Sequence, residues 1–364
     1  MYRIAAFVAI LAGLVSVGAA AVADGTVASS AHDYRDVHFD YFVSGNPSSP
    51  RAQHTDFGLV LMGGGGRVAA AFQEIARRAG RGHIVILRAV SDGSYDPDDG
   101  DYGRSFSGEW GPVASAETIV FHDRQAAYDA RVIAALRGAD GIFIAGGDQA
   151  NYVRYWKGTP VQRLLDDHVV ANRPIGGSSA GLAILGHYSY TAFDGGSMES
   201  KAALADPFDP GVTLEKDFLH YRFLDRLLTD THFSARCRLG RLIVFLARLQ
   251  TDLPGSGVYG VGVDERTAML VDASGSGRLL EGSEGSAWVV SLPTQTPRLT
   301  AGQPLNLARV RVARMDPRSR LALGSGQVTL PVATTILNIV GGRAAEESSA
   351  SAILRRETVP PDED

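Results

Sequence analysis

The stretch that decides the fold is PIGGSSAGLAIL, residues 174–185. Its centre, Gly177-Ser178-Ser179-Ala180-Gly181, has the pattern G-x-S-x-G, which is typical of a strand that turns sharply into a helix. Small residues around Ser179 permit the tight turn, and the first amides of the following helix point at its hydroxyl. Because short Gly/Ser/Ala runs are also common in ordinary turns, this pattern alone leaves both a catalytic and a structural interpretation open.

A histidine in a second motif makes the catalytic interpretation stronger. The stretch Asp230-Thr231-His232-Phe233-Ser234 is followed by Arg236, Arg238 and Arg241 at the start of an amphipathic segment. A serine hydroxyl needs a nearby base at neutral pH, and His232 is the candidate for that base. The arginines suit a bound anion, although a solvated helix face is the alternative.

Apolar runs of strand length alternate with helical segments through the first two thirds of the chain. The strands are expected at 57–62, 83–87, 118–121 and 141–145, and the helices at 68–79, 127–137 and 150–166. This alternation predicts an α/β fold, a mostly parallel sheet covered by helices on both faces. From about residue 256 the pattern changes to an antiparallel extension, with strands at 258–265, its hairpin partner at 268–271, and further strands at 287–292, 308–314 and 328–336.

Two loops and one cysteine could suggest a phosphate site, a calcium site and a thiol nucleophile, but their sequences do not favour these roles. The loop Gly63–Gly66 lacks the Gly-Lys-Ser/Thr of a phosphate-binding loop, so we expect its backbone to pass close to the active site or a neighbouring segment. The acidic stretch Asp96–Asp101 has Ser107 where a calcium loop needs glutamate, which favours a solvated loop. Cys237 is expected to be a small buried thiol rather than a nucleophile.

Composition and the N-terminus restrict partners and location. The 364 residues carry a net charge of −5, which disfavours binding to nucleic acid. Arg3, the apolar run Ile4–Val17 and the small residues Ala21-Val22-Ala23 predict a cleaved secretory signal at residues 1–23. A membrane anchor is the alternative, but the run is short for a stable span. We therefore expect a secreted or periplasmic protein.

Three motifs in one order resemble a known family. Gly146-Gly147-Asp148-Gln149, the Ser179 motif and the His232 motif together resemble the cyanophycinase branch of the S51 serine peptidases, a group that includes dipeptidase E. The resemblance covers about residues 57–275 and extends to Val263-Asp264-Glu265 and Thr267-Ala268. It implies a fold like class-I glutamine amidotransferases with serine at the turn. The expected division is a signal at 1–23, an arm at 24–55, a catalytic domain at 56–275, a β-rich extension at 276–342 and a flexible tail at 343–364.

The resemblance also assigns roles to residues. It implies Ser179 as nucleophile, His232 as base, and the amides of Gly147 and Ala180 as the oxyanion hole. Residues matched to the substrate pocket are Gln149, Asp230, Arg236, Arg238 and Arg241. The acid of the triad is expected between the serine and the histidine, where Glu199 is preferred and Asp194 is the alternative. Cyanophycinases usually have glutamine at the position of Thr231, which leaves the substrate open.

These features together predict an exported serine peptidase that needs no cofactor or metal. The arginines suit a substrate with carboxylates, and Asp148 and Asp230 suit a cationic group, as in the β-aspartyl-arginine units of cyanophycin. The alternatives are a dipeptidase acting on other acidic peptides, an α/β-hydrolase-type esterase, and a non-catalytic binding protein. A homodimer is left open.

Overall fold

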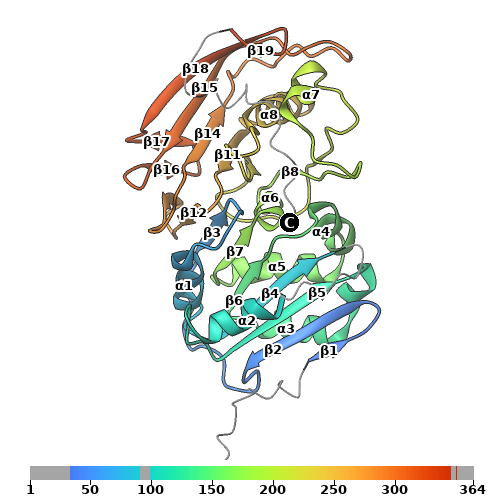
Figure 1. Ribbon diagram of the computed structural model, residues 1–364, viewed down its shortest axis with the longest axis vertical. Coiled ribbons are helices and arrows are strands. Elements are labelled where there is room, and N and C mark those ends of the chain that lie inside the picture. The colour runs from blue at the N-terminus through green and yellow to red at the C-terminus, as the bar shows by residue number, and fades with distance from the viewer. Residues whose placement is uncertain (1–32, 91–98, 346–349, 351–364) are drawn as a thin grey trace, which may run out of the picture. The chain divides into compact units, whose positions relative to one another are not determined.

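A mixed eleven-stranded sheet organises the computed structural model, which describes residues 33–90, 99–345 and 350 (Figure 1). Its centre is parallel, in the order β5-β4-β6-β7-β3. These strands are β3 (Leu59–Met62), β4 (His83–Ala89), β5 (Ser115–Phe121), β6 (Gly141–Ile144) and β7 (Ile175–Ser178). Antiparallel strands extend both edges: β1 (Tyr34–Arg35) and β2 (Phe39–Gly45) on one, and β12 (Ala268–Val271), β13 (Ser276–Leu279), β16 (Arg320–Ala322) and β17 (Gln327–Thr329) on the other. The predicted α/β class with a mostly parallel core is confirmed.

Helices cover both faces of the parallel strands because these strands are apolar on both sides. On β4, Ile84 and Ile86 pack with α1, while Val85 and Leu87 belong to the cluster that contains side chains of the helices on the other face. The helices are α1 (Ala69–Arg78), α2 (Asp99–Ser107), η1 (Arg124–Tyr128), α3 (Ala130–Gly138), α4 (Gln149–Trp156), α5 (Pro160–Val170), α6 (Ala180–Ala183), α7 (Ser200–Ala205) and α8 (Leu239–Asp252). The single helix predicted at 150–166 is two helices, because Gly158 takes a positive φ and Pro160 starts a new first turn.

A second, six-stranded sheet carries the other half of the site. Its order is β10-β11-β14-β15-β18-β19, and only β10 and β11 run parallel. The strands are β10 (Leu227–Asp230), β11 (Tyr259–Val263), β14 (Ala287–Ser291), β15 (Leu307–Met315), β18 (Ala333–Val340) and β19 (Arg343–Ala344); β8 (Ser189–Tyr190) and β9 (Leu214–Glu215) form a separate pair. The predicted hairpin of 258–265 with 268–271 is wrong, since β11 pairs with β10 and β14 whereas β12 pairs with β3 and β13. The turn between them crosses from one sheet to the other.

The predicted division into arm, domain and extension does not match the packing. Within the expected arm, β2 pairs with β5 over its whole length, from Phe39 opposite Phe121 to Gly45 opposite Ser115. Strands on both sides of residue 275 belong to the main sheet, and the described residues fall within one compact unit. The signal at 1–23, the loop at 91–98 and most of the tail at 343–364 lie outside the described residues. Among the helices that are described, none has the length and apolarity to cross a membrane.

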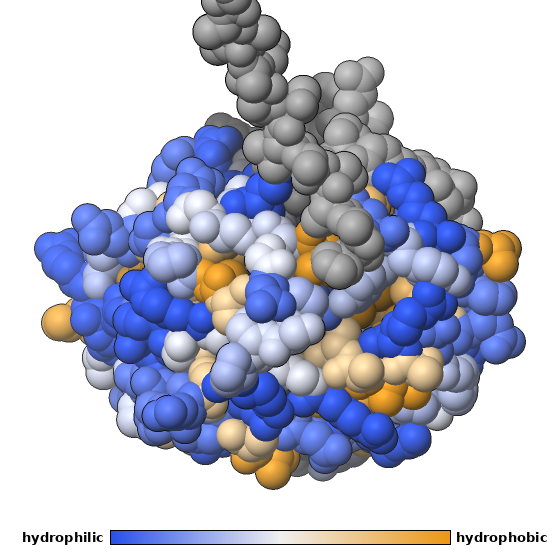
Figure 2. Space-filling view, turned by 90° about the horizontal axis from the view of Figure 1, so that it is seen from below, coloured by the Kyte–Doolittle hydropathy of each residue, from blue (hydrophilic) through white to orange (hydrophobic). Residues whose placement is uncertain are grey.

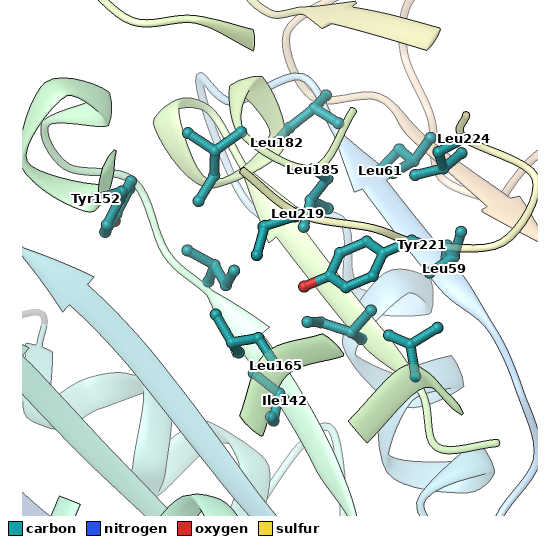
Figure 3. Close-up of a cluster of buried hydrophobic side chains, with 14 of the residues drawn as sticks. Leu59, Leu61, Ile142, Tyr152, Leu165, Leu182, Leu185, Leu219, Tyr221 and Leu224 are labelled. Atoms are coloured by element: carbon teal, nitrogen blue, oxygen red, sulfur yellow. The ribbon is translucent and has the colours of Figure 1, made fainter. Parts of the chain in front are cut away.

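The core lies directly beneath the Ser179 turn. Leu182 and Leu185, which follow this turn, belong to the same buried apolar cluster as Leu59 and Leu61 of β3 and the ring of Tyr221 (Figure 3). On the face shown in Figure 2, hydrophobic residues form small separate groups within a mostly hydrophilic surface. The turn that carries Ser179 therefore rests on a buried apolar cluster.

Candidate active site

Ser179 occupies the tight turn that its neighbours predict. It has φ 52° and ψ −122° between the end of β7 and the start of α6, and it is partly exposed. A Cβ on Gly177 would stand 2.5 Å from the carbonyl oxygen of Gly181, and one on Gly181 would stand 2.2 Å from that of Ile144. Both positions therefore require glycine, and the turn presents the serine at the carboxyl edge of the parallel sheet.

His232 and Glu265 complete a hydrogen-bonded relay with Ser179. Oγ of Ser179 lies 2.8 Å from Nε2 of His232, and Nδ1 of the same ring lies 2.8 Å from Oε1 of Glu265. A carboxylate at Nδ1 selects the tautomer with its proton on Nδ1, so Nε2 accepts the proton of the serine. His232 is only 3 % exposed, and its backbone amide donates to the carbonyl of Gly63. The predicted pairing of Ser179 with His232 is present, and the third member is a residue that the sequence did not single out for this role.

The expectation that Glu199 is the acid is wrong in this geometry. Glu199 is the exposed N-cap residue of α7, and the alternative, Asp194, is exposed in the preceding loop. Glu265 is at His232 because β10 and β11 are parallel neighbours, with Asp230 opposite Gly262. His232 and Glu265 each follow the carboxyl end of one of these strands, so their side chains meet at one edge of the sheet. The sequence does not show that β10 and β11 are neighbours, so it could not indicate Glu265 as the acid.

The glycine loop at 63–66 lies against all three residues of the relay. A Cβ on Gly64 would stand 2.5 Å from Nε2 of His232 and 3.0 Å from Cβ of Ser179, and one on Gly65 would stand 2.6 Å from the side chain of Glu265. Gly64 also has φ +90°, a conformation that residues with side chains rarely adopt. The predicted close approach of this backbone to the active site is confirmed.

Burial and charge keep His232 suited to act as a base. Burial lowers the pKa of its imidazole, the hydrogen bond that Nδ1 donates to Glu265 opposes that effect, and the charges of Arg236 and Arg238 lower the pKa further. The net direction is downward from 6.5, so the ring is neutral at neutral pH. A neutral ring with a free lone pair at Nε2 is the form that can take the proton of Ser179.

Of the two residues expected to form an oxyanion hole, Ala180 adjoins the nucleophile in the chain, and Gly147 follows a residue that lies near it. Ala180 follows Ser179 and is the first residue of α6, where a helix has no internal acceptor for its amide. Gly146 is close enough to Ser179 that a Cβ there would stand 3.6 Å from the Cβ of the serine, and the next residue, Gly147, is exposed. An oxyanion site formed by the amides of Gly147 and Ala180 stays a prediction.

Two of the five predicted substrate residues bind each other instead. Arg241 is 2 % exposed and donates two hydrogen bonds to Asp230, from Nε to Oδ2 at 2.9 Å and from Nη2 to Oδ1 at 2.5 Å. Asp230 is equally buried. The structure therefore gives these two side chains a role in holding the end of β10, and the expectation that they contact substrate directly is not met.

Of the other three predicted substrate residues, Arg236 and Arg238 lie near His232. Arg238 donates to the carbonyl and the hydroxyl of Thr231, the residue before His232, at 3.0 and 2.9 Å. Gln149 donates to the carbonyl of Tyr190 at 2.6 Å. Arg236 is half-buried and near enough to lower the pKa of His232. Cys237 is buried, as expected.

Asp264 positions the acid and the base relative to each other. Its Oδ1 accepts from the amide of Ser234 at 2.9 Å and from its hydroxyl at 2.6 Å, and its Oδ2 accepts from the amide of Ser286 at 3.0 Å. Both carboxylate oxygens also lie 3.2 Å from Nε1 of Trp288. Because Ser234 is two residues past His232 and Asp264 precedes Glu265, this carboxylate fixes the two segments that carry the acid and the base.

The described residues hold no group of three or more His, Cys, Asp or Glu side chains arranged to bind a metal ion. The acidic stretch weighed as a calcium loop begins at Asp96, and its side chains up to Asp101 lie outside the described part of the chain. The chemistry on view is that of an activated serine.

Comparisons with known proteins show what the chain is similar to. Residues 111–205 match the family model "Peptidase family S51". The chain is 28% identical over 275 residues to cyanophycinase from Trichormus variabilis, covering 72% of this chain and 84% of that protein. It is 28% identical over 290 residues to cyanophycinase from Synechococcus elongatus, covering 74% and 83%. Among solved structures, a peptidase from an acI-B1 Actinobacterium aligns with a TM-score of 0.46 and 16% identity, covering 70% of this chain and 98% of that one. Residues 111–205 are thus similar to S51 peptidases, and 72% to 74% of the chain is similar to cyanophycinases. These similarities and the activated serine support a serine-type peptidase.

Proposed function

We propose that the protein hydrolyses peptide bonds at aspartyl residues through a triad of Ser179, His232 and Glu265, with cyanophycin as the favoured substrate. The observation that carries the proposal is the continuous relay, 2.8 Å from Ser179 to His232 and 2.8 Å from His232 to Glu265. Relatives named cyanophycinase over most of the chain supply the substrate class. The product expected from the polymer is the β-aspartyl-arginine dipeptide.

The first half of the reaction forms an acyl-enzyme. Oγ of Ser179 attacks the scissile carbonyl while its proton moves to Nε2 of His232, and Glu265 stabilises the imidazolium that results. The oxyanion accepts hydrogen bonds from the amides of Gly147 and Ala180, each worth on the order of 3 kcal/mol in the transition state. The imidazolium then gives its proton to the leaving amine, and the carbon–nitrogen bond breaks.

The second half restores the serine. Water gives a proton to the neutral His232, its oxygen attacks the ester carbonyl, and a second oxyanion forms in the same place. When the carbon–oxygen bond to Ser179 breaks, the proton on Nε2 returns to the serine oxygen. The carboxylic acid product leaves, and no other group in the site has changed its protonation.

The N-terminal sequence favours action outside the cytoplasm. Arg3, the apolar run Ile4–Val17 and Ala21-Val22-Ala23 are typical of a cleaved export signal. An exported enzyme of this kind would act on polymer released by other cells. Detection of the protein in the secreted or periplasmic fraction, with its N-terminus at Asp24, is the expected result.

The test of the reaction uses purified protein with cyanophycin and with α- and β-aspartyl dipeptides. The wild type is expected to release β-aspartyl-arginine from cyanophycin, and Ser179→Ala is expected to release none. Asp194→Asn serves as a matched control, because it removes an exposed carboxylate outside the relay. Cleavage of the dipeptides alone would indicate a dipeptidase instead, and hydrolysis of simple esters alone would indicate an esterase. No product from any of these substrates, with Ser179 also inert to a serine-directed phosphonate, would refute hydrolysis.

A further inference from the structure

The outward face of strand β18 is apolar and exposed. Side chains alternate along the strand, and Leu337 and Ile339 are buried in the cluster that contains the apolar side chains of α8. Val332, directly before the strand, Ile336 and Val340 lie on the opposite face and are 47%, 47% and 61% exposed. An antiparallel sheet with one solvated face usually presents polar side chains to water. The outward face of β18 does not follow this pattern.

The segment that contains β18 also concentrates exposed apolar side chains. Among the described residues, eight large hydrophobic side chains are exposed, and four of them lie between residues 330 and 340. A single exposed apolar residue is ordinary on a protein surface, whereas a group of them marks a contact surface. The charges around this group indicate which partner it fits.

Arginines lie beside two of these aliphatic side chains. In the antiparallel ladders, Arg311 of β15 is directly opposite Ile336, and Arg343 of β19 is directly opposite Val340. Residues that are directly opposite each other project from the same face of a sheet. Arg309 is exposed next to them, and its amide accepts the side chain of Asn338 as its hydrogen-bond partner at 3.0 Å. Cationic and aliphatic side chains are therefore interleaved on one face.

The segment around this face is strongly basic. Residues 287–345 contain seven arginines, no lysine and a single acidic residue, Asp316, which gives a net charge of +6 in a chain whose net charge is −5. Asp316 is paired with Arg318 at 2.9 Å. Within the described part of the chain, Arg309, Arg311 and Arg343 have no acidic partner at ion-pair distance. The face is therefore complementary in charge to an anionic surface.

Two other occupants fit these side chains less well. A second copy joined edge to edge at β18 would bring the arginines of both copies close together, and like charges repel. A soluble polyanion would pair with the arginines but leave Ile336 and Val340 in water. An anionic lipid surface satisfies both kinds of side chain, because its headgroups pair with guanidinium groups and its acyl boundary accepts aliphatic ones.

We propose that the outward face of β15, β18 and β19 is a docking surface for a membrane that carries anionic phospholipid. Arg309, Arg311 and Arg343 bind the phosphates of the headgroups, and Ile336 and Val340 enter the boundary between headgroups and acyl chains. The protein lies on the lipid surface through this face and does not span it.

The docking surface is separate from the relay. In the order of the six-stranded sheet, β18 is three strands beyond β11, the strand that Glu265 follows (Figure 1). At the usual spacing of neighbouring strands this separation is about 15 Å. Docking therefore does not depend on the proposed hydrolysis, and labelling of Ser179 by a phosphonate reports the relay independently.

The test is sedimentation of the purified protein with vesicles of phosphatidylcholine, either alone or mixed equally with phosphatidylglycerol. The wild type is expected to bind only the mixed vesicles and to be released as the salt concentration rises. Arg311→Gln/Arg343→Gln is expected to weaken binding about 25-fold, since each arginine near an anionic surface contributes about fivefold. Arg137→Gln/Arg163→Gln is the matched control, because it removes the same charge from exposed positions on α3 and α5, and it is expected to bind as the wild type does. All variants share the same N-terminal residues, so a difference between them reports this face.

A second variant distinguishes a lipid surface from a soluble polyanion. Ile336→Thr/Val340→Thr keeps the branched shape of both side chains and is expected to weaken vesicle binding about tenfold through lost apolar burial. Its binding of inorganic polyphosphate is expected to equal that of the wild type. An unchanged urea midpoint and normal labelling of Ser179 show that each variant is folded.

Several results would overturn the proposal. These are a wild type indifferent to phosphatidylglycerol, and either variant of the face binding mixed vesicles as tightly as the wild type. A concentration-dependent dimer that both variants abolish would assign the face to a second copy instead. Vesicle binding by a protein that hydrolyses none of the peptides would refute the proposed function alone.

Discussion

Glu265→Gln is the substitution that best tests whether Glu265, rather than the Glu199 expected from the sequence, is the acid of the triad. The change keeps the shape of the side chain but removes the charge 2.8 Å from Nδ1 of His232. The amide of glutamine can donate to Nδ1, which would hold the ring in the tautomer that cannot accept from Ser179. Loss of a triad carboxylate costs about 10⁴ in kcat when it is buried. Because the Glu265 side chain is 22% exposed, water can replace part of its effect, and we expect a loss of about 10³, or about 4 kcal/mol in the transition state.

The assay is steady-state hydrolysis of cyanophycin together with the rate at which a fluorophosphonate labels Ser179, which needs no knowledge of the substrate. Glu265→Gln is expected to slow both, with an unchanged urea midpoint showing that the fold is intact. Glu199→Gln is the matched control, and its exposed position predicts rates close to those of the wild type. A normal rate in Glu265→Gln together with a collapse in Glu199→Gln would refute the reasoning from the strand ends.

Four further outcomes follow from the same contacts. Gly64→Ala is expected to abolish labelling of Ser179, because its Cβ would stand 2.5 Å from Nε2 of His232, whereas Gly138→Ala, with nothing within 4 Å, is expected to leave labelling unchanged. The acid limb of kcat/KM is expected below pH 6.5, since burial lowers the pKa of His232 and the active neutral ring persists as the pH falls through that value; a midpoint above 6.5 would contradict this. Asp230→Asn is expected to reduce the free energy of unfolding by about 3–5 kcal/mol, because it leaves two buried cations unpaired, and urea denaturation measures the loss. Burial also lowers the pKa of His168 to about 3, so the unfolded chain binds more protons between about pH 6.5 and pH 3. Stability should therefore fall as the pH drops through that range, by up to about 1.4 kcal/mol per pH unit, and His168→Gln should flatten the slope.

The parts of the site that could be predicted are those whose function depends on local sequence. The turn at Ser179 needs small neighbours within two residues, so the motif itself reveals it. His232 follows a strand and precedes a helix that are both visible as apolar patterns. The parallel core could be predicted equally well, because strands buried on both faces are apolar along their whole length.

The parts that could not be predicted depend on which strands are neighbours. Glu265 reaches His232 only because β10 and β11 pair in parallel, and the sequence suggested instead that the strand before Glu265 forms a hairpin with 268–271. Likewise, the three arginines after His232 look alike in the sequence but have different surroundings in the structure. Arg241 points inward to Asp230, and this becomes visible only when α8 is placed against β10.

Ser179 follows a strand of the first sheet, whereas His232 and Glu265 follow strands of the second. This division matters when such proteins are recognised from a partial sequence match or are truncated. The family match at residues 111–205 includes the nucleophile but neither the base nor the acid, which belong to the second sheet. A gene fragment ending soon after the matched region would retain the recognisable signature and be inert. The presence of the residues that follow the matched region, up to Glu265, is therefore a better criterion for an active protein than the family match alone.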